Sequence, residues 1–293
     1  MSVTAIEAGL REKPDDWPAW QVYADHLTTE GDVRGELIRL EHERAIRSAD
    51  QSAGAVAAVR DNARSRRLHN ETRALTKQHE EQWREGLDHA VVVSWLHGFV
   101  SSVQLTWSLE SVASLEKFLA TPNARFLTRV GFPERGVSAE SLSVVEAVAK
   151  LELPLLRCFS LAYTALGGPA VRAARRAKWF SSLVELDLRY CALRDEGVGE
   201  LRGAELPRLH ALRLQKNELS AAGVRALGTM TAPALRVLDL RYNPLGDDGA
   251  RAFAELPFVP ALTDVLIRER DVAGSAMAGL PLAAPLRRYW NAR

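Results

Sequence analysis

The sequence predicts an α/β fold built as a solenoid, with a parallel sheet on its concave face and helices outside, preceded by a small all-helical domain. The first observation is a leucine pattern that occurs three times in tandem, 26 residues apart: Leu183, Leu186, Leu188, Cys191, Leu193; Leu209, Leu212, Leu214, Asn217, Leu219; Leu235, Leu238, Leu240, Asn243, Leu245. A fixed period of this length indicates stacked supersecondary units. The second observation is that a helix signal follows each copy, so each unit predicts one strand and one helix.

The strand is predicted from leucines that alternate with polar residues, which buries one face of the segment. Asn217 and Asn243 follow the strand inside the core, where each amide needs hydrogen bonds to backbone at the turn. Cys191 takes the same position in the first copy, because a free thiol is a small and mostly apolar core residue.

The helix after each strand is predicted from acidic residues that favour its positive end, as in Asp195-Glu196-Gly197 and Asp247-Asp248-Gly249. One apolar residue of each helix then faces the sheet: Leu201, Leu227 and Phe253. The whole pattern resembles the leucine-rich repeat, and its length and glycine position are similar to the ribonuclease-inhibitor-type subclass. That resemblance implies a horseshoe with a parallel concave sheet.

Weaker copies extend the register in both directions, so we expect about seven repeats, starting at residues 100, 127, 156, 183, 209, 235 and 262. Two β-rich runs on either side of His97-Gly98 predict a hairpin that caps the first repeat. Residues 285–290 are expected to cap the other end. The repeat domain, with both caps, is predicted to span residues 90–293.

Residues 1–50 form a different, helical unit. Its hallmarks are Pro14-Asp15-Asp16, then Tyr23-Ala24-Asp25, then a Gly-Asp-x-Arg-Gly-Glu motif within residues 31–40. Together they resemble the small bacterial repeat-companion domain that precedes leucine-rich repeats, although His26 stands where that family usually has Trp. The resemblance implies company with repeats and no settled activity. Residues 51–89 predict a helical connector, either one long helix or two, with Gly54 and Asn70 as candidate breaks.

Composition sets broad limits on function. The chain has 293 residues and a formal net charge of +1, which gives no global attraction to nucleic acid or membranes. No signal peptide or apolar run long enough to span a bilayer is seen, and Cys158 and Cys191 are interpreted as free thiols. We therefore expect a cytoplasmic protein, with a small-molecule ligand unlikely to be its main partner.

No catalytic or metal-binding motif is found. The sequence lacks a phosphate-binding loop, a nucleophile elbow and a zinc-helix pattern, and it predicts no cofactor. Asp25, Asp32, Arg34 and Glu36 are the candidates for a site in the N-terminal unit. The structural alternative is that Arg34 pairs with an acidic neighbour and Asp32 caps the helix that follows. The basic cluster of Arg172, Arg175, Arg176 and Lys178 is interpreted as a solvated outer face.

The best candidate site lies on the predicted concave face. Equivalent residues of neighbouring parallel strands stack about 4.8 Å apart, so repeat positions form columns. One column predicts a lateral ladder of alternating charge: Ser160, Asp187, Arg213, Asp239, Leu266. The next two columns supply the predicted partner-binding residues: Arg189, Gln215, Arg241 and Arg268, beside Tyr163, Tyr190, Lys216 and Tyr242. Tyr and Arg are the residue types that dominate binding hot spots.

The leading hypothesis is a non-enzymatic protein–protein interaction module that binds its partner on this face. The arginines favour a partner of acidic character. Two alternatives stay open: a regulatory scaffold of the GTPase-activating type for a small GTPase, on fold-level analogy, and an enzyme in the N-terminal unit.

Overall fold

The computed structural model describes residues 2–50, 58–134, 136–138, 140–268 and 271–272. The chain divides into two compact units. The first comprises residues 1–87, 93–102 and 117–127, and the second comprises residues 88–92, 103–116 and 128–293. This division differs from the predicted boundaries at residues 50 and 89, because helix α4 packs against α3 and so belongs to the first unit.

The helices of the first unit are α1 (Val3–Glu12), α2 (Trp17–Thr29), α3 (Arg34–Asp50), α4 (Ala58–Trp83) and the 3-10 helix η2 (Pro122–Phe126). The predicted break at Asn70 is absent, since α4 continues through it, and Gly54 lies outside the described residues. Asp16 caps α2 by accepting a hydrogen bond from the backbone of Ala19, as its position predicts.

Helix α2 ends at Thr29, and residues 30–31 form the turn that follows it. In its last turn the hydroxyls of Thr28 and Thr29 donate to the carbonyls of Ala24 and Asp25, four residues earlier. The core of this unit is aromatic, with Trp20, Tyr23, Phe99 and Phe126 packed together and buried.

The strands are β1 (Val92–Leu96), β2 (Phe99–Gln104), β3 (Arg129–Gly131), β4 (Cys158–Ser160), β5 (Glu185–Asp187), β6 (Ala211–Arg213), β7 (Val237–Asp239) and β8 (Asp264–Leu266). They form one sheet in chain order, and β3 to β8 pair in parallel. The hairpin predicted around His97-Gly98 is confirmed by β1 and β2, and β1 lies at the end of the strand order.

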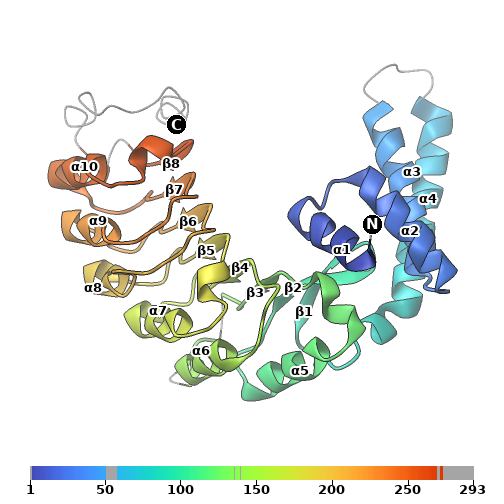
Figure 1. Ribbon diagram of the computed structural model, residues 1–293, viewed down its shortest axis with the longest axis horizontal. Helices are drawn as coiled ribbons and strands as arrows, with labels where there is room; N and C mark the ends of the chain where they lie inside the picture. The colour runs from blue at the N-terminus through green and yellow to red at the C-terminus, as the bar shows by residue number, and fades with distance from the viewer. Residues whose placement is uncertain (1, 51–57, 135, 139, 269–270, 273–293) are drawn as a thin grey trace. The chain divides into compact units, whose positions relative to one another are not determined.

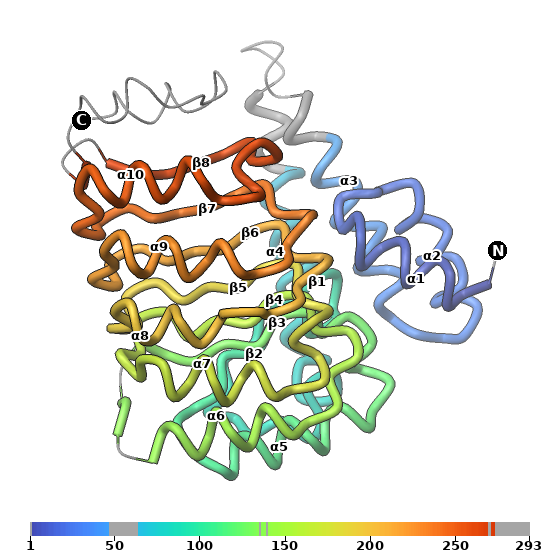
Figure 2. Tube along the Cα trace, turned by 60° about the vertical axis from the view of Figure 1, so that its left-hand side comes forward, coloured from blue at the N-terminus to red at the C-terminus, as the bar shows by residue number. Residues whose placement is uncertain are grey.

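The remaining helices are α5 (Leu109–Leu119), α6 (Ser141–Lys150), α7 (Gly167–Arg175), α8 (Arg194–Gly199), α9 (Ala221–Leu227) and α10 (Gly246–Ala254), with 3-10 helices η3 (Phe180–Ser182) and η4 (Val259–Ala261). Within the second unit, the strands β3 to β8 lie on one side of the chain and the helices α6 to α10 on the other (Figure 1). Figure 2 shows the repeats as successive layers, each with one strand and one helix. The predicted mixed α/β fold with a mostly parallel sheet is therefore confirmed.

The core of the second unit is made by the residues that the pattern placed there. Leu186, Leu212 and Leu238 align in register across β5, β6 and β7, and all three are fully buried. Leu227 of α9, Phe253 of α10 and Leu201, which follows α8, are also fully buried. At about 25 cal/mol per Å2 of apolar surface, each such side chain contributes roughly 2 kcal/mol.

The buried asparagines connect each repeat to the preceding one. Asn217 Oδ1 accepts hydrogen bonds from the backbone N–H groups of Cys191 and Leu193, and its amide nitrogen donates to the carbonyl of Leu188. Asn243 makes the same contacts one repeat later, with Asn217 and Leu219 as its donors. The predicted role of the polar repeat position is thereby confirmed, and its partners lie on the neighbouring repeat as well as on its own turn.

The predicted C-terminal cap at residues 285–290 lies outside the described residues. Among the described helices, none is both long and apolar enough to cross a lipid bilayer.

Candidate functional site

Four residues that follow strand ends form the candidate site: Tyr163, Tyr190, Lys216 and Tyr242. We call them the left-handed strip, because each has a positive φ, between 53° and 64°. The prediction placed them in a column on the concave face, beside the column of arginines, and the structure places them just beyond the strand ends. Their conformation disfavours L-residues by about 1 kcal/mol or more each, so neighbouring contacts must hold it in place.

Backbone hydrogen bonds between repeats hold the strip. The N–H groups of Tyr163, Tyr190 and Lys216 donate to carbonyls of the next repeat over 2.8–2.9 Å. At the last position the acceptor changes, and the N–H of Tyr242 donates to the carboxylate of Asp271 over 2.7 Å. The carboxylate of Asp271 therefore takes the place of a backbone carbonyl at the end of this series of hydrogen bonds between repeats.

The tyrosine rings of the strip are ordered by stacking. Tyr163 and Tyr190 stack with their centroids 4.6 Å apart and their planes 18° from parallel. The guanidinium carbon of Arg268 lies 3.6 Å from the ring centroid of Tyr242, and that of Arg189 lies 5.8 Å from that of Tyr163. In both cases the arginine of one repeat covers the tyrosine of the repeat before it, an arrangement favoured by cation–π attraction.

The predicted site arginines are each paired with an aspartate. The pairs are Arg189 with Asp187, Arg241 with Asp239, and Arg268 with Asp271, at 2.6–2.8 Å. These hydrogen bonds are the main reason why the pKa of each guanidinium is raised, so each stays charged. Each of these charges has a counter-charge within the chain, and the acidic character of the partner stays a prediction.

Gln215 was predicted to lie on the exposed surface that contacts the partner, but the structure buries it. Its residue surface is only 7% exposed, and its amide nitrogen contacts the carboxylate of Asp239. Gln215 occupies the repeat position that Arg189 and Arg241 occupy in their own repeats. A shorter amide there lies against the neighbouring repeat's buried carboxylate and does not reach solvent.

The predicted lateral charge ladder is also corrected. The column itself is in register, with Asp187 beside Arg213 and Arg213 beside Asp239. The residues of this column, however, do not pair with one another. Arg213 pairs diagonally with Glu185, and Glu185 also pairs with Arg129, which lies in the same row two strands away. These two guanidinium groups offset the effect of burial and lower the pKa of the Glu185 carboxyl. A Cα register of 4.8 Å places side chains as neighbours without fixing which one each selects.

The pairing aspartates were missed as functional neighbours, although the sequence carried a signal for them. The motif Asp-Leu-Arg-Tyr occurs at residues 187–190 and again at 239–242. Residues two apart on a strand share one face, so the aspartate and the arginine of each motif are adjacent on the surface. This spacing favours the strand-parallel pair over the lateral one.

A family model described as "Leucine Rich repeat" matches residues 181–201 and 232–254, which are the first and third strong copies with their helices. The chain carries leucine-rich repeats. Such repeats generally mediate protein–protein interaction, and proteins of this kind are typically non-enzymatic. No curated protein matches the sequence.

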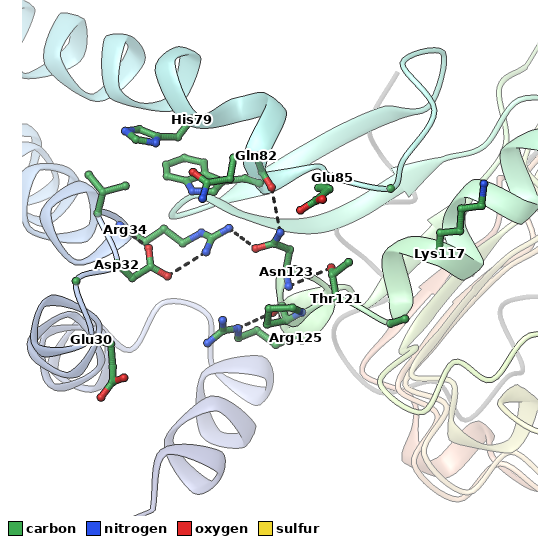
Figure 3. Close-up of a pocket in the computed structure, with 16 residues that line it drawn as sticks. Glu30, Asp32, Arg34, His79, Gln82, Glu85, Lys117, Thr121, Asn123 and Arg125 are labelled. Atoms are coloured by element: carbon green, nitrogen blue, oxygen red, sulfur yellow. Dashed lines mark hydrogen bonds and ion pairs between the residues drawn. The ribbon is translucent and has the colours of Figure 1, made fainter.

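The first unit contains a separate open pocket of about 800 Å3 (Figure 3). It lies where the turn between α2 and α3, the end of α4 and the segment around η2 meet. Arg34 lines this pocket and is only 4% exposed. Its guanidinium lies close to the rings of Trp83 and Phe99. Burial lowers the pKa of this guanidinium, and Asp32 opposes that effect.

The hydrogen bonds of Arg34 connect four segments of the first unit. Its guanidinium donates to the carbonyl of Gly98, to the carboxylate of Asp32 and to Oδ1 of Asn123, whose amide donates in turn to the carbonyl of Gln82. The backbone N–H of Arg34 donates to Asp32, as the capping interpretation expected. These contacts confirm that Arg34 pairs with an acidic neighbour and that Asp32 caps α3.

The four residues considered for an enzyme site do not form one group of contacts. Asp25 pairs with Arg39 on the surface, Asp32 is bound to Arg34, and Glu36 is exposed. Within the part of the chain that the structure describes, no group of three His, Cys, Asp or Glu side chains could hold a metal ion.

Proposed function

We propose that this protein is a non-enzymatic interaction module whose repeats form a solenoid, and that it binds a protein partner along the left-handed strip and the adjoining concave face. The observation that carries the proposal is the fixed geometry of Tyr163, Tyr190 and Tyr242. Their backbones are held by hydrogen bonds between repeats, and their rings are stacked on each other or on arginine. Large side chains that are already ordered lose little conformational entropy on binding.

The partner-facing groups of this proposal are the three tyrosines with Lys216, and Arg189, Arg241 and Arg268 as their support. Tyr242 is 41% exposed, which is unusual for a large aromatic residue, and Lys216 is exposed beside it. Gln215 is excluded from the contact surface because it is buried. The arginines act by holding the rings in place, so the proposal does not require a strongly acidic partner.

The proposal extends to the first unit, which we take to be the repeat-companion domain, in a supporting and non-catalytic role. Arg34 supports this because its guanidinium is used in contacts within the unit. The GTPase-activating alternative is not carried further, because no particular contact of the described residues favours it over another protein partner.

The test is site-specific photo-crosslinking in extract of the source cell. A photoreactive phenylalanine analogue is placed at Tyr242, or at Leu109 of helix α5 as the matched control, since both side chains are exposed. We expect one cross-linked protein from position 242, absent from position 109 and lost when Tyr163 and Tyr190 are both replaced by Ala. Equal cross-linking from both positions, or no change with the double variant, would contradict the proposal.

A further inference from the structure

The sheet ends at β1, and the outer edge of this strand can pair with a further strand. β1 comes first in the strand order, with β2 on one side and no strand among the described residues on the other. His97 and Gly98, which join β1 to β2, both have positive φ, 51° and 80°. This is the type I′ turn of a two-residue hairpin, and it determines which backbone groups of β1 face β2 and which face outward.

The outward groups of β1 belong to Val93 and Trp95. In an antiparallel hairpin, the pair next to the two-residue turn exchanges hydrogen bonds, and so does every second pair after it. Ser94 therefore pairs with Ser101, and the hydroxyl of Ser101 also donates to the carbonyl of Ser94 over 3.1 Å. The N–H and C=O groups of Val93 and Trp95 point away from β2. Within the described part of the chain, these groups have no hydrogen-bond partner.

The sequence of β1 lacks the features that usually protect an exposed edge. Charged side chains and proline are common devices against edge pairing, and the strand Val92–Leu96 contains neither. On one face of the strand, Trp95 packs against Trp83 of α4, with ring centroids 6.2 Å apart. On the other face Ser94 is exposed, and Val92, at 62%, is the most exposed large hydrophobic residue of the described chain.

From these features we propose that β1 pairs with β1 of a second copy of this chain, antiparallel, about a twofold axis at Ser94. In this register Val93 lies opposite Trp95 of the second copy, and every outward N–H and C=O group of both strands finds a partner. A register shifted along the strand leaves some of these groups unpaired. The side chains match as well, because Ser94 faces itself across the axis and Val92 faces Leu96.

A second copy suits this edge because the strand is its own complement. The twofold axis repeats each contact, and no charged side chain of β1 meets its own kind across it. The chain has a formal net charge of +1, so two copies repel each other only weakly. A pair of five-residue strands covers less than the roughly 1,000 Å2 that a stable interface buries, so we expect a weak dimer that forms at high concentration.

The experiment is sedimentation equilibrium of the full chain between about 1 μM and about 1 mM, a range that brackets a weak association. We expect dimer to accumulate toward the upper end. Ser94→Lys and Ser94→Glu each place like charges opposite each other at the axis, and each should weaken the association about tenfold or more. An equimolar mixture of the two variants should dimerise again, because opposite charges then face each other across the axis.

Ser181 provides the matched control, since it is exposed in η3. Ser181→Lys and Ser181→Glu should dimerise as the native chain does. The side chain of Ser94 is exposed, so its variants should keep the native urea midpoint, and this midpoint is measured for every chain compared.

The inference is overturned if the native chain stays monomeric over the whole range. It is also overturned if the Ser94 variants dimerise as the native chain does, or if their mixture does not restore the dimer, because another surface then joins the copies. A photoreactive residue at Ser94 that captures a different protein from extract, with the native chain monomeric, would show that the edge takes a foreign strand. None of these results bears on the left-handed strip, so the proposed function stands or falls by its own test.

Discussion

Asp239 is fully buried, and both of its carboxylate oxygens accept hydrogen bonds from Arg241, two residues further along the chain. The distances are 3.0 Å from Nε and 2.7 Å from Nη2. Gln215 contacts the same carboxylate from the preceding repeat. The guanidinium of Arg241 therefore compensates the charge of the Asp239 carboxylate, which has no access to water.

The first prediction concerns this pair. Arg241→Ala leaves the buried carboxylate without its counter-charge, so we expect the free energy of unfolding to fall by about 2 kcal/mol, since Arg241 is partly exposed and solvent reduces the full effect of a buried pair. Urea denaturation measures this change. Arg251→Ala removes a pair with Asp248 that is exposed on the outer side, and it should leave the midpoint unchanged.

Equal midpoints for Arg241→Ala and the native chain would show that this pair makes no net contribution to stability. The same reasoning affects experiments on binding. An Arg241→Ala variant confounds lost contact with lost stability, so tyrosine variants are the cleaner probes of the strip.

The second prediction concerns Cys191, which takes the place of the asparagines in the first strong repeat. Its thiol donates to the carbonyl of Leu161 over 2.9 Å, much as Asn217 and Asn243 donate to Leu188 and Leu214. A thiol has no second strong acceptor for the backbone of the preceding repeat. We expect Cys191→Asn to add those hydrogen bonds and raise the free energy of unfolding by about 1 kcal/mol.

Thermal and urea unfolding of Cys191→Asn would be compared with Cys191→Ala, which should be destabilised because it loses the thiol contact and leaves a small cavity. If the asparagine variant is destabilised as much as the alanine variant, the turn before Thr164 has diverged too far to accept an amide.

The sequence was sufficient to predict the repeat architecture because its signals are local and repeated. Leu186, Leu212 and Leu238 define the period, the strand and the buried face at once. The choice of ion-pair partner was not predicted, because Asp187 has both Arg189 and Arg213 within reach and only side-chain geometry selects between them. The burial of Gln215 was missed for the same reason, since its contact with Asp239 lies between repeats.

In the first unit, by contrast, only the local contact of Arg34 could be predicted from the sequence. Its motif around Arg34 suggested a pairing with Asp32, which is found. The partners at Gly98 and Asn123 lie 64 and 89 residues further along the chain, and no sequence pattern points to contacts at such separation.

The third prediction is a dependence of stability on alkaline pH. Burial raises the pKa of both thiols, Cys158 and Cys191, from 9.0 to about 12. In the unfolded chain these thiols ionise near pH 9, while the folded chain keeps them protonated. Their contribution to stability is therefore complete below pH 9 and is lost as the pH rises from 9 toward 12.

Urea unfolding between pH 7 and pH 10.5 measures the effect, with the Cys158→Ala, Cys191→Ala double variant as control. The decline above pH 9 should be shallower in the double variant, because its chain has no thiols to ionise on unfolding. Parallel declines in both chains would show that lysine and tyrosine groups account for the whole dependence. A thiol reagent at pH 8 should likewise modify the buried Cys191 only after denaturant is added.

The last prediction tests whether Arg34 is structural. Lysine preserves the positive charge at this position but lacks the planar fork that donates to Gly98, Asp32 and Asn123 at once. It also loses the flat contact with Trp83. We expect Arg34→Lys to lower the free energy of unfolding of the first unit by about 2 kcal/mol, because an ammonium group cannot donate to the buried carbonyl of Gly98 and to both side-chain acceptors at once. Tryptophan fluorescence during urea unfolding reports this unit when the tryptophans of the second unit, Trp107, Trp179 and Trp290, are replaced by Phe in all the chains compared. Arg39→Lys, at the exposed pair with Asp25, is the matched control and should not change the urea midpoint.

The structural assignment of Arg34 is wrong if Arg34→Lys unfolds at the native midpoint and yet alters the binding of a partner or ligand. In that case Arg34 acts through the pocket that it lines.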